Sequence, residues 1–561
     1  MSRTPPAPHA DAPPVRRLPL AGVLRLGRPS DIWFKPALSV VVAVAPPNLL
    51  LLVLGRLDLA MYTMAGSLCA LYAHNRPYVA RARVLAWVVL GMIGGLAVAL
   101  LAAALTSDAV VLVAVGAVLA AVQKVLCDAT RVGPPGNVVL TFISSAALFA
   151  PQTLGQIPAH LALAAVAGVW AWLVGMAPGL LRPHGPERRA TAHALTAAAG
   201  YAVTRGAGAG HAKARTAAAA AVQAAWQSLL SAGAPTATRR SLERLVVRAE
   251  VALAAPSDTD PERLRAWARD LRGTGPVPRT GQLPTESDEL LGVDEEFAAP
   301  VRPWWSRLGP LAPLAVRTAL GCALAGYASL ALGVGRPYWA LVTAASLYQA
   351  NLTLTWSRGV QRVVGNLLGV LLFAAVVPLA HLGPAALVLC CLAFNFGAEA
   401  LISRNYWLGS VCVTPMALLI TEFAGYQRPG LLIAERMVDT AVGALVGFVA
   451  AVAVTNRRAG DRVEQTLTDL ERSRERAARL LAEPHPAPGS LETARRGLAT
   501  ALVDLRATVE AASGEWWQRA LPHERVVLAE QSGHRTLAAT VRRQGLHLDL
   551  PTDQATEDVR P

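Results

Sequence analysis

The chain has 561 residues, of which 53% are hydrophobic and 16% are charged, and its mean hydropathy of +0.38 excludes an ordinary soluble protein. The net charge of +14 does not indicate a nucleic-acid-binding protein, because the basic residues lie between apolar runs and not on one soluble face. Nearly all of that positive charge is arginine, since the only lysines are Lys35, Lys124 and Lys213. Composition therefore predicts a membrane protein with the lipid bilayer, and no nucleic acid, as its partner.

The N-terminal segment, residues 1–35, is basic and rich in proline. It contains no short apolar core followed by a small-residue cleavage site, so a removable signal peptide is not expected. We expect residues 1–35 to form a disordered basic cytoplasmic tail.

Charge-free apolar windows of the length needed to cross a bilayer, about 20 residues for roughly 30 Å of hydrocarbon, follow the tail. Each half of the chain holds enough of them for six spans, because one long window in each half is broken by proline and must hold two helices. The windows are residues 36–55, 59–75, 84–107, 109–123 and 132–181 in the first half, and 318–335, 337–357, 363–398, 405–421 and 440–456 in the second.

The two halves also repeat a local pattern. Tyr62, the block 71–75, Arg81 with Arg83, and an apolar helix with Gly91 and Gly95 recur in the same order in the second half, in the stretch 338–369. Such paired repeats are typical of transporters.

Arginine-rich turns alternate with turns that carry little charge, and the positive-inside rule places the arginine-rich turns in the cytoplasm. An even number of spans in each half makes the two repeats parallel. The fold class is then an all-α membrane protein with two parallel six-helix transmembrane repeats, about 12 spans, each followed by a cytoplasmic helical domain. The expected domains after the tail are 36–181, 182–310, 311–456 and 457–561, with both termini in the cytoplasm.

Residues 182–310 and 457–561 are more polar, and their apolar residues return at helical spacing. We interpret these stripes as the cores of small helical bundles or as a dimer contact. The six cysteines lie in or beside apolar segments without metal-ligand spacing, and no nucleotide-binding or catalytic set is present. The sequence predicts no metal, no cofactor and no enzymatic activity, so that any transport must use a gradient.

Four blocks in the second half resemble the fusaric-acid-resistance-like family, the bacterial aromatic acid exporter group. The blocks are residues 338–343, the basic turn 358–362 with its following glycines, residues 405–408 with 414–415, and residues 435–440 with their following glycines. Asn366 stands where the family usually has threonine. The first half matches only in outline, with His160 and Gly168 but no equivalent of the charged block 435–440.

The resemblance implies an inner-membrane efflux protein for aromatic carboxylic acids or related organic anions. The chain also looks distantly like the plant aluminium-activated malate transporters, which implies a dimeric anion channel as the second alternative and leaves a homodimer open. A third alternative is a non-transporting membrane scaffold whose cytoplasmic bundles bind a partner. The sequence names no particular substrate and does not decide between exporter and channel.

Candidate site residues fall in two charged groups. Arg358 and Arg362 lie four residues apart and share a helix face, where paired guanidinium groups can orient a carboxylate, although arginines also mark cytoplasmic helix ends. Glu435 and Asp439 are also four apart, inside the predicted sixth span, and Arg436 can pair with Asp439. We expect Arg358, Arg362 and Arg436 to line an anion pathway, and Glu435 and Asp439 to act in proton coupling or in an ion pair.

Two pairs of glycines have the small-xxx-small spacing of close helix contacts. We expect helix packing at Gly365, Gly369, Gly443 and Gly447.

Overall fold

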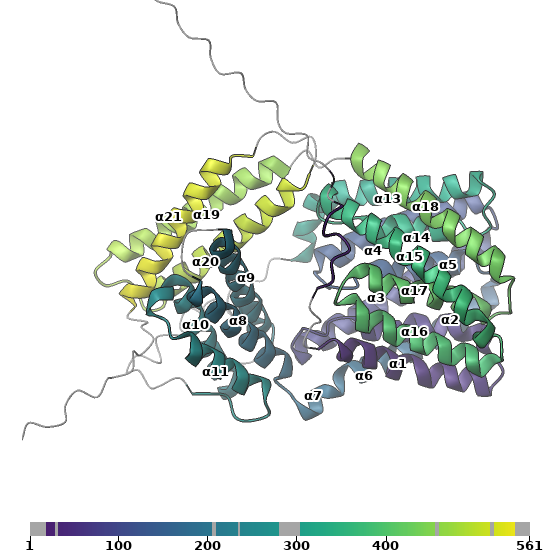
Figure 1. The fold of residues 1–561 in the computed structure, drawn as a ribbon, viewed down its shortest axis with the longest axis horizontal. Coiled ribbons are helices and arrows are strands. Elements are labelled where there is room, and N and C mark those ends of the chain that lie inside the picture. Colours follow the sequence, from purple (N-terminus) through teal and green to yellow (C-terminus); the bar gives the residue numbers. More distant parts are fainter. Residues whose placement is uncertain are drawn as a thin grey trace, which may run out of the picture.

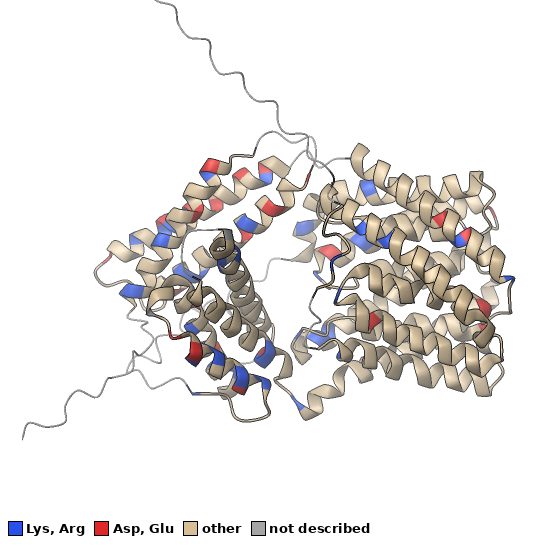
Figure 2. Ribbon diagram, viewed as in Figure 1, with Lys and Arg blue, Asp and Glu red and all other residues tan. Residues whose placement is uncertain are grey.

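The computed structural model describes residues 18, 20–27, 32–204, 209–233, 236–279, 303–454, 459–515 and 521–544. These residues form helices and no strands, in two bodies (Figure 1). One is an apolar bundle with few charges, and the other is a polar helical body on which charged residues are frequent (Figure 2).

The apolar bundle has two halves. The first half consists of α1 (Phe34–Val53), η1 (Leu57–Leu59), α2 (Ala60–Ser67), η2 (Leu68–Leu71), α3 (Tyr78–Leu105), α4 (Ala109–Ala129), α5 (Val138–Leu148), η3 (Leu154–Gln156), α6 (Ile157–Met176) and the short α7 (Pro178–Leu181). The second half consists of η6 (Trp304–Arg307), α13 (Leu308–Ala331), α14 (Tyr338–Leu347), α15 (Leu352–Ala380), α16 (Pro384–Ile402), α17 (Tyr406–Glu422) and α18 (Pro429–Ala453).

Eight helical segments among the described residues are long and apolar enough to cross a membrane. Four shorter apolar segments stand between them in the chain: Leu57–Leu71, Val138–Leu148, Tyr338–Leu347 and Tyr406–Glu422. The all-helical membrane class expected from composition is therefore confirmed. The short segments are largely buried inside the bundle, and every residue of α14 is buried.

Helix boundaries differ from the charge-free windows where a charge lies inside a helix. The window 440–456 missed the first turns of α18, which begins at Pro429 and contains Arg436 and Asp439 as buried residues. The window 318–335 missed the start of α13, because Arg317 is buried there and its Nε donates to the carbonyl oxygen of Val454 at 2.9 Å. Charge-free windows mark the hydrocarbon core but not helix ends, since a buried partner satisfies the charge.

The window 337–357 is likewise not one helix. It is divided because α14 ends at Leu347 and Asn351 caps the next helix, its Oδ1 accepting from the backbone N–H of Leu354 at 2.9 Å. Arg358 therefore lies near the start of α15, on the same helix as Arg362.

The helix contacts inside the first half match those inside the second half, and the first helix of each half also packs on the other half. Helix α2 packs on α6 as α14 packs on α18, and α3 packs on α5 as α15 packs on α17. Helix α1 also packs on α16 of the second half, and α13 packs on α4 of the first. The first helix of each half therefore covers the fourth helix of the other half.

The polar helical body combines helices from both of the more polar segments of the sequence. Its helices are α8 (Gly185–Val203), α9 (Ala209–Leu230), α10 (Ala237–Ala254), η4 (Pro256–Asp258), α11 (Pro261–Arg272), α19 (Ala459–Ala482), α20 (Ser490–Ser513) and α21 (His523–Arg543). The apolar stripes expected from the sequence form two buried clusters, one on α8–α11 and one on α19–α21.

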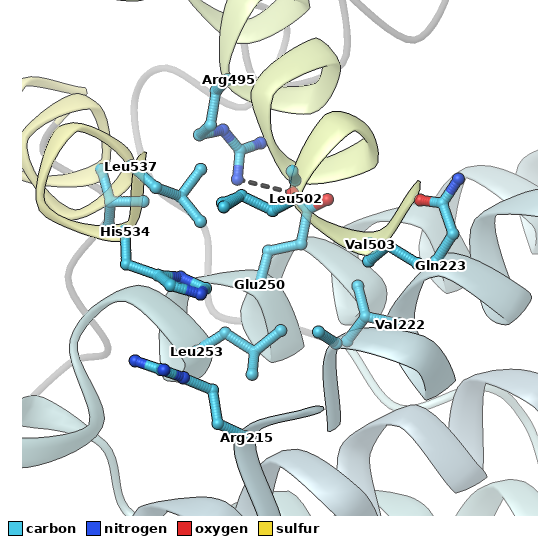
Figure 3. A pocket seen from close by; sticks show the side chains of 13 residues that line it. Arg215, Val222, Gln223, Glu250, Leu253, Arg495, Leu502, Val503, His534 and Leu537 are labelled. Atoms are coloured by element: carbon cyan, nitrogen blue, oxygen red, sulfur yellow. Dashed lines mark ion pairs between the residues drawn. The ribbon is translucent and has the colours of Figure 1, made fainter. Parts of the chain in front are cut away.

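The two segments of this body meet at a buried ion pair, in which Glu250 of α10 and Arg495 of α20 approach to 2.5 Å (Figure 3). Trp226 of α9 donates to Glu250 at 2.7 Å, and the guanidinium of Arg496 lies 3.8 Å from the centre of the Trp226 ring. His534 lines the small cavity beside the pair, and burial lowers its pKa to about 4. The segments expected as two separate bundles thus share contacts within one body.

The helical body also contacts the second half of the apolar bundle. Thr353, in the first turn of α15, donates from its N–H and its hydroxyl to the carbonyl oxygen of Gly514 at 3.1 and 2.9 Å. Glu515 lies 3.6 Å from Arg317, and burial raises the pKa of Glu515 while Arg317 opposes this shift. The end of α20 is therefore held against α13 and α15.

Most of the tail predicted to be disordered, residues 1–35, lies outside the described residues. Residues 20–27 are described and contact the beginning of α17. The carbonyl oxygens of Val23 and Arg25 accept from the amide of Asn405 at 3.1 and 3.0 Å, and that of Leu24 accepts from the Trp407 indole at 3.1 Å. This part of the tail is ordered by polar side chains that its sequence alone does not reveal.

Candidate functional site

A series of buried polar groups follows α15, α17 and α18 through the second half of the apolar bundle. At one end, Arg362 is 3% exposed and its Nη1 donates to the Tyr406 hydroxyl at 3.1 Å. The guanidinium of Arg358, one turn earlier on α15, lies 3.9 Å from the centre of the Tyr406 ring. The two arginines expected to share a helix face thus meet on one tyrosine, which orients both.

The middle of the series is a neutral hydrogen-bond chain. Asn366 of α15 donates to the Thr440 hydroxyl of α18 at 2.9 Å, and the Thr414 hydroxyl of α17 donates to the Asn366 oxygen. Asn366, Thr414 and Thr440 are all buried. The asparagine that replaces the usual threonine therefore connects three helices.

At the other end lies Arg436, which is 1% exposed. Its guanidinium is 5.1 Å from the centre of the Trp339 ring on α14, and its Nε and Nη1 have no hydrogen-bond partner among the described residues. A buried guanidinium with unmet donors is costly unless it binds an anion or water. Arg436 is therefore the strongest candidate anion ligand in the bundle.

Asp439 and Glu435 have separate partners. Asp439 is fully buried, its Oδ1 accepts from the Ser329 hydroxyl at 2.5 Å, and its Oδ2 has no partner among the residues that the structure describes. Glu435 is paired with Arg336, which also donates to Gln427. The spacing suggested an ion pair between Arg436 and Asp439, but the ring of Trp339 and the hydroxyl of Ser329 are the neighbours that these two groups contact.

Helix directions give the depth of the two buried arginines. The glycine contacts run in step along α15 and α17, and along α14 and α18, so each of these pairs is parallel. Because only four residues join α14 to α15, α15 runs opposite to α18. The Cα atoms of Arg362 and Arg436 each precede the Asn366–Thr440 bond by one turn, so these Cα atoms lie on opposite sides of it, about 12 Å apart along the axis.

The four glycines hold these helices at close range. A Cβ on Gly365 would lie 2.6 Å from the carbonyl oxygen of Trp407, and one on Gly369 would lie 2.6 Å from Thr414 Cβ. A Cβ on Gly443 would lie 2.5 Å from the carbonyl oxygen of Ala340, and Gly447 lies against Ala344. The close α15–α17 and α14–α18 contacts bring the polar groups within hydrogen-bonding reach of one another.

Sequence reasoning missed the neutral and aromatic members of this site. The four blocks contain Trp339, Tyr406 and Thr414, but the sequence did not indicate a role for these residues. It also did not indicate that Ser329 and Arg336 are partners of the charged residues. The available signal was an aromatic residue in the first two positions of a short apolar segment in two of the blocks, at Trp339 and Tyr406. No group of three or more metal-ligating side chains occurs in the described part of the chain.

The apolar helices and the buried polar series define a helical membrane protein with transporter-like features. Residues 323–450, which hold most of the site, match the family model described as fusaric acid resistance protein-like. The resemblance expected from the four blocks is confirmed for this segment.

A protein of Bacillus subtilis (strain 168), described as "Uncharacterized membrane protein YvaC", is 30% identical over 146 residues. This similarity covers 26% of the present chain and 23% of that protein, so the chain matches about a quarter of its curated relative. No solved structure matches the chain.

Proposed function

We propose that the protein is an inner-membrane exporter of organic anions, with aromatic carboxylates as the substrate class and the proton gradient as the driving force. The observation that carries this proposal is the Arg436 guanidinium, buried on the face of Trp339 with two unmet donor nitrogens. A carboxylate can accept two parallel hydrogen bonds from a guanidinium, and an aromatic ring attached to it can pack beside an indole.

The path of the anion follows from the order of the polar groups. Arg358 and Arg362 attract the anion at one mouth, the Asn366 layer separates that mouth from the interior, and Arg436 binds the anion beyond this layer. The buried Asp439, with one oxygen already bonded to Ser329, is the group that takes up and releases a proton. Glu435 serves as an ion-pair partner of Arg336 and not as the coupling group.

The topology in this proposal has twelve spans in two parallel repeats, with the four short apolar segments counted as spans. The polar helical body then lies in the cytoplasm, beside the Arg358 mouth, and both termini are cytoplasmic. A reporter that is active only in the periplasm, fused after Arg240, should be silent. Activity of this reporter would contradict the parallel arrangement.

The direct test is export of benzoate from inverted vesicles or proteoliposomes that contain the full chain. An imposed pH gradient should accelerate benzoate transport, and an uncoupler should abolish the acceleration. Transport that depends only on the benzoate gradient, with unchanged rates after uncoupling, would favour the anion-channel alternative. Absence of benzoate and related carboxylate transport in well-inserted protein would favour the scaffold.

A further inference from the structure

A second basic site lies in the first half of the apolar bundle, away from the polar series of the second half. It is a cavity of about 480 Å³ between the beginning of α1, the beginning of α3, the end of α6 and α8. Lys35, Arg81, Arg189 and His74 line one end of it. None of these residues belongs to the blocks that resemble the exporter family.

The basic end of the cavity has donors that no described residue satisfies. Arg81 is 4% exposed and donates from Nη2 toward His74 Nδ1 at 3.0 Å, while Arg189 donates from Nε to the carbonyl oxygen of Gly185 at 3.2 Å. Arg81 Nε, Arg189 Nη1 and His74 Nε2 are buried without a hydrogen-bond partner in the described part of the chain. Three unmet nitrogens at one place indicate a missing anion.

In the part of the chain that the structure describes, the cluster has no close ion pair with a carboxylate. Among the described residues, no ion pair joins Lys35, Arg81 or Arg189 to an acidic side chain, and the nearby Glu187 is 3.9 Å from His184 instead. The positive charges of Lys35, Arg81 and Arg189 are therefore gathered against their mutual repulsion, which an occupying anion would relieve.

The rest of the cavity wall is apolar and faces outward. Leu38 and Val42 of α1 and Trp170 and Leu173 of α6 line it, with 54%, 42%, 37% and 49% of their surfaces exposed. The Trp170 indole donates to the carbonyl oxygen of Val42 at 3.0 Å and fixes the two helices beside each other. Because α1 and α6 are candidate membrane spans, this wall opens toward lipid chains.

From this layout we propose that the cavity binds an anionic phospholipid. The phosphate lies on Arg81, Arg189, His74 and Lys35, and an acyl chain follows the groove between α1 and α6. A basic pocket at the end of membrane helices has the position and the charge that anionic headgroups require. A small soluble anion would satisfy the donors but would leave the outward apolar groove unused, so an amphipathic occupant fits the whole cavity.

The test measures lipid binding to the purified full chain in detergent by native mass spectrometry. Phosphatidylglycerol should remain bound, and phosphatidylcholine with the same chains should not. Arg81→Gln with Arg189→Gln should weaken phosphatidylglycerol binding roughly fivefold for each cation removed. Arg83→Gln is the matched control, because Arg83 is on the same helix turn but exposed, and it should leave binding unchanged.

Further experiments distinguish a phospholipid from other occupants of the cavity. Lys35→Gln, which alters a partly buried side chain at the edge of the cluster, should weaken binding about fivefold even if the double variant fails to fold. Phosphatidylglycerol with brominated chains should quench the Trp170 fluorescence, and the quenched component should be missing in Trp170→Phe. Equal binding by wild type and folded Lys35→Gln, or full displacement of the lipid by inorganic phosphate or benzoate, would overturn the proposal.

Discussion

The two halves of the apolar bundle have the same order of helix contacts but different interiors. When Tyr62 is aligned with Tyr338, His160 of α6 takes the place that Arg436 has in α18. His160 is stacked on Tyr62, with ring centres 3.8 Å apart, and its Nδ1 is 3.0 Å from Gln152 Oε1. Arg436 instead lies on Trp339, and two of its donor nitrogens have no partner in the described part of the chain.

The same contrast holds deeper in each half. In the first half, Gln123 accepts from Thr141 at 3.0 Å and donates to Ser144 at 2.9 Å, so a neutral network satisfies its own groups. In the second half, one oxygen of Asp439 has no partner among the described residues. A satisfied neutral network stabilises one arrangement, whereas an unmet buried charge invites a ligand or a proton. In the function proposed above, the second half forms the anion pathway and the first half supports it.

The largest effect is expected when each of the two matched residues is replaced by glutamine. Arg436→Gln should lower benzoate export roughly ten- to hundredfold, because a hydrogen bond to a charged group contributes about 1.5–3 kcal/mol. His160→Gln is the control in the other half and should change the rate little. Initial rates in proteoliposomes at matched protein content measure both. Equal losses in the two variants would show that both halves bind the anion.

The second test concerns coupling. Asp439→Asn should make export insensitive to an imposed pH gradient, because the carboxylate that remains near the anion site, Glu435, is held in an ion pair with Arg336. Glu435→Gln should keep the pH response, since Glu435 is already paired with Arg336. The ratio of export rates with and without the gradient is the measurement. Full gradient dependence in Asp439→Asn would remove Asp439 from the mechanism.

A smaller effect is expected at the mouth of the second half. Arg362→Lys keeps the charge but loses the planar donor pair, and Arg362→Gln loses both, so export should fall in the order wild type, Lys, Gln. Each step is expected to be roughly fivefold, the equivalent of about 1 kcal/mol for one lost hydrogen bond. Arg83→Gln, at the exposed counterpart turn of the first half, is the control. Equal export by all variants would leave Arg362 only a topological role.

The architecture that the halves share can be tested through stability. Gly66 of α2 faces α6, where a Cβ would lie 2.1 Å from the carbonyl oxygen of Ala164, and Gly443 of α18 faces α14 in the matching interface. Gly66→Ala and Gly443→Ala should each destabilise the protein by about 1–3 kcal/mol through overpacking. Gly91→Ala, with open space around it, should not. Thermal melting in detergent compares the three, and a stable Gly66→Ala would break the correspondence.

The sequence predicts the membrane class and the positions of Arg362, Arg436 and Asp439 because charges inside apolar runs are rare and visible. It does not predict the partners of these charges. Trp339 and Ser329 lie on other helices, and which helices touch depends on packing that spacing along one helix does not encode. The single helical body was missed for the same reason, since Glu250 and Arg495 are far apart in the chain.

The exchange of first helices between the halves has a consequence for biosynthesis. Helix α1 leaves the ribosome long before α16, on which it packs, and α4 likewise precedes α13. Helices α1 and α4 must stay inserted in lipid, with one face not yet packed, until α16 and α13 have been synthesised. We therefore expect that neither half matures alone, and that a chain interrupted within residues 280–302 recovers its native contacts only by assembly of two fragments in the membrane.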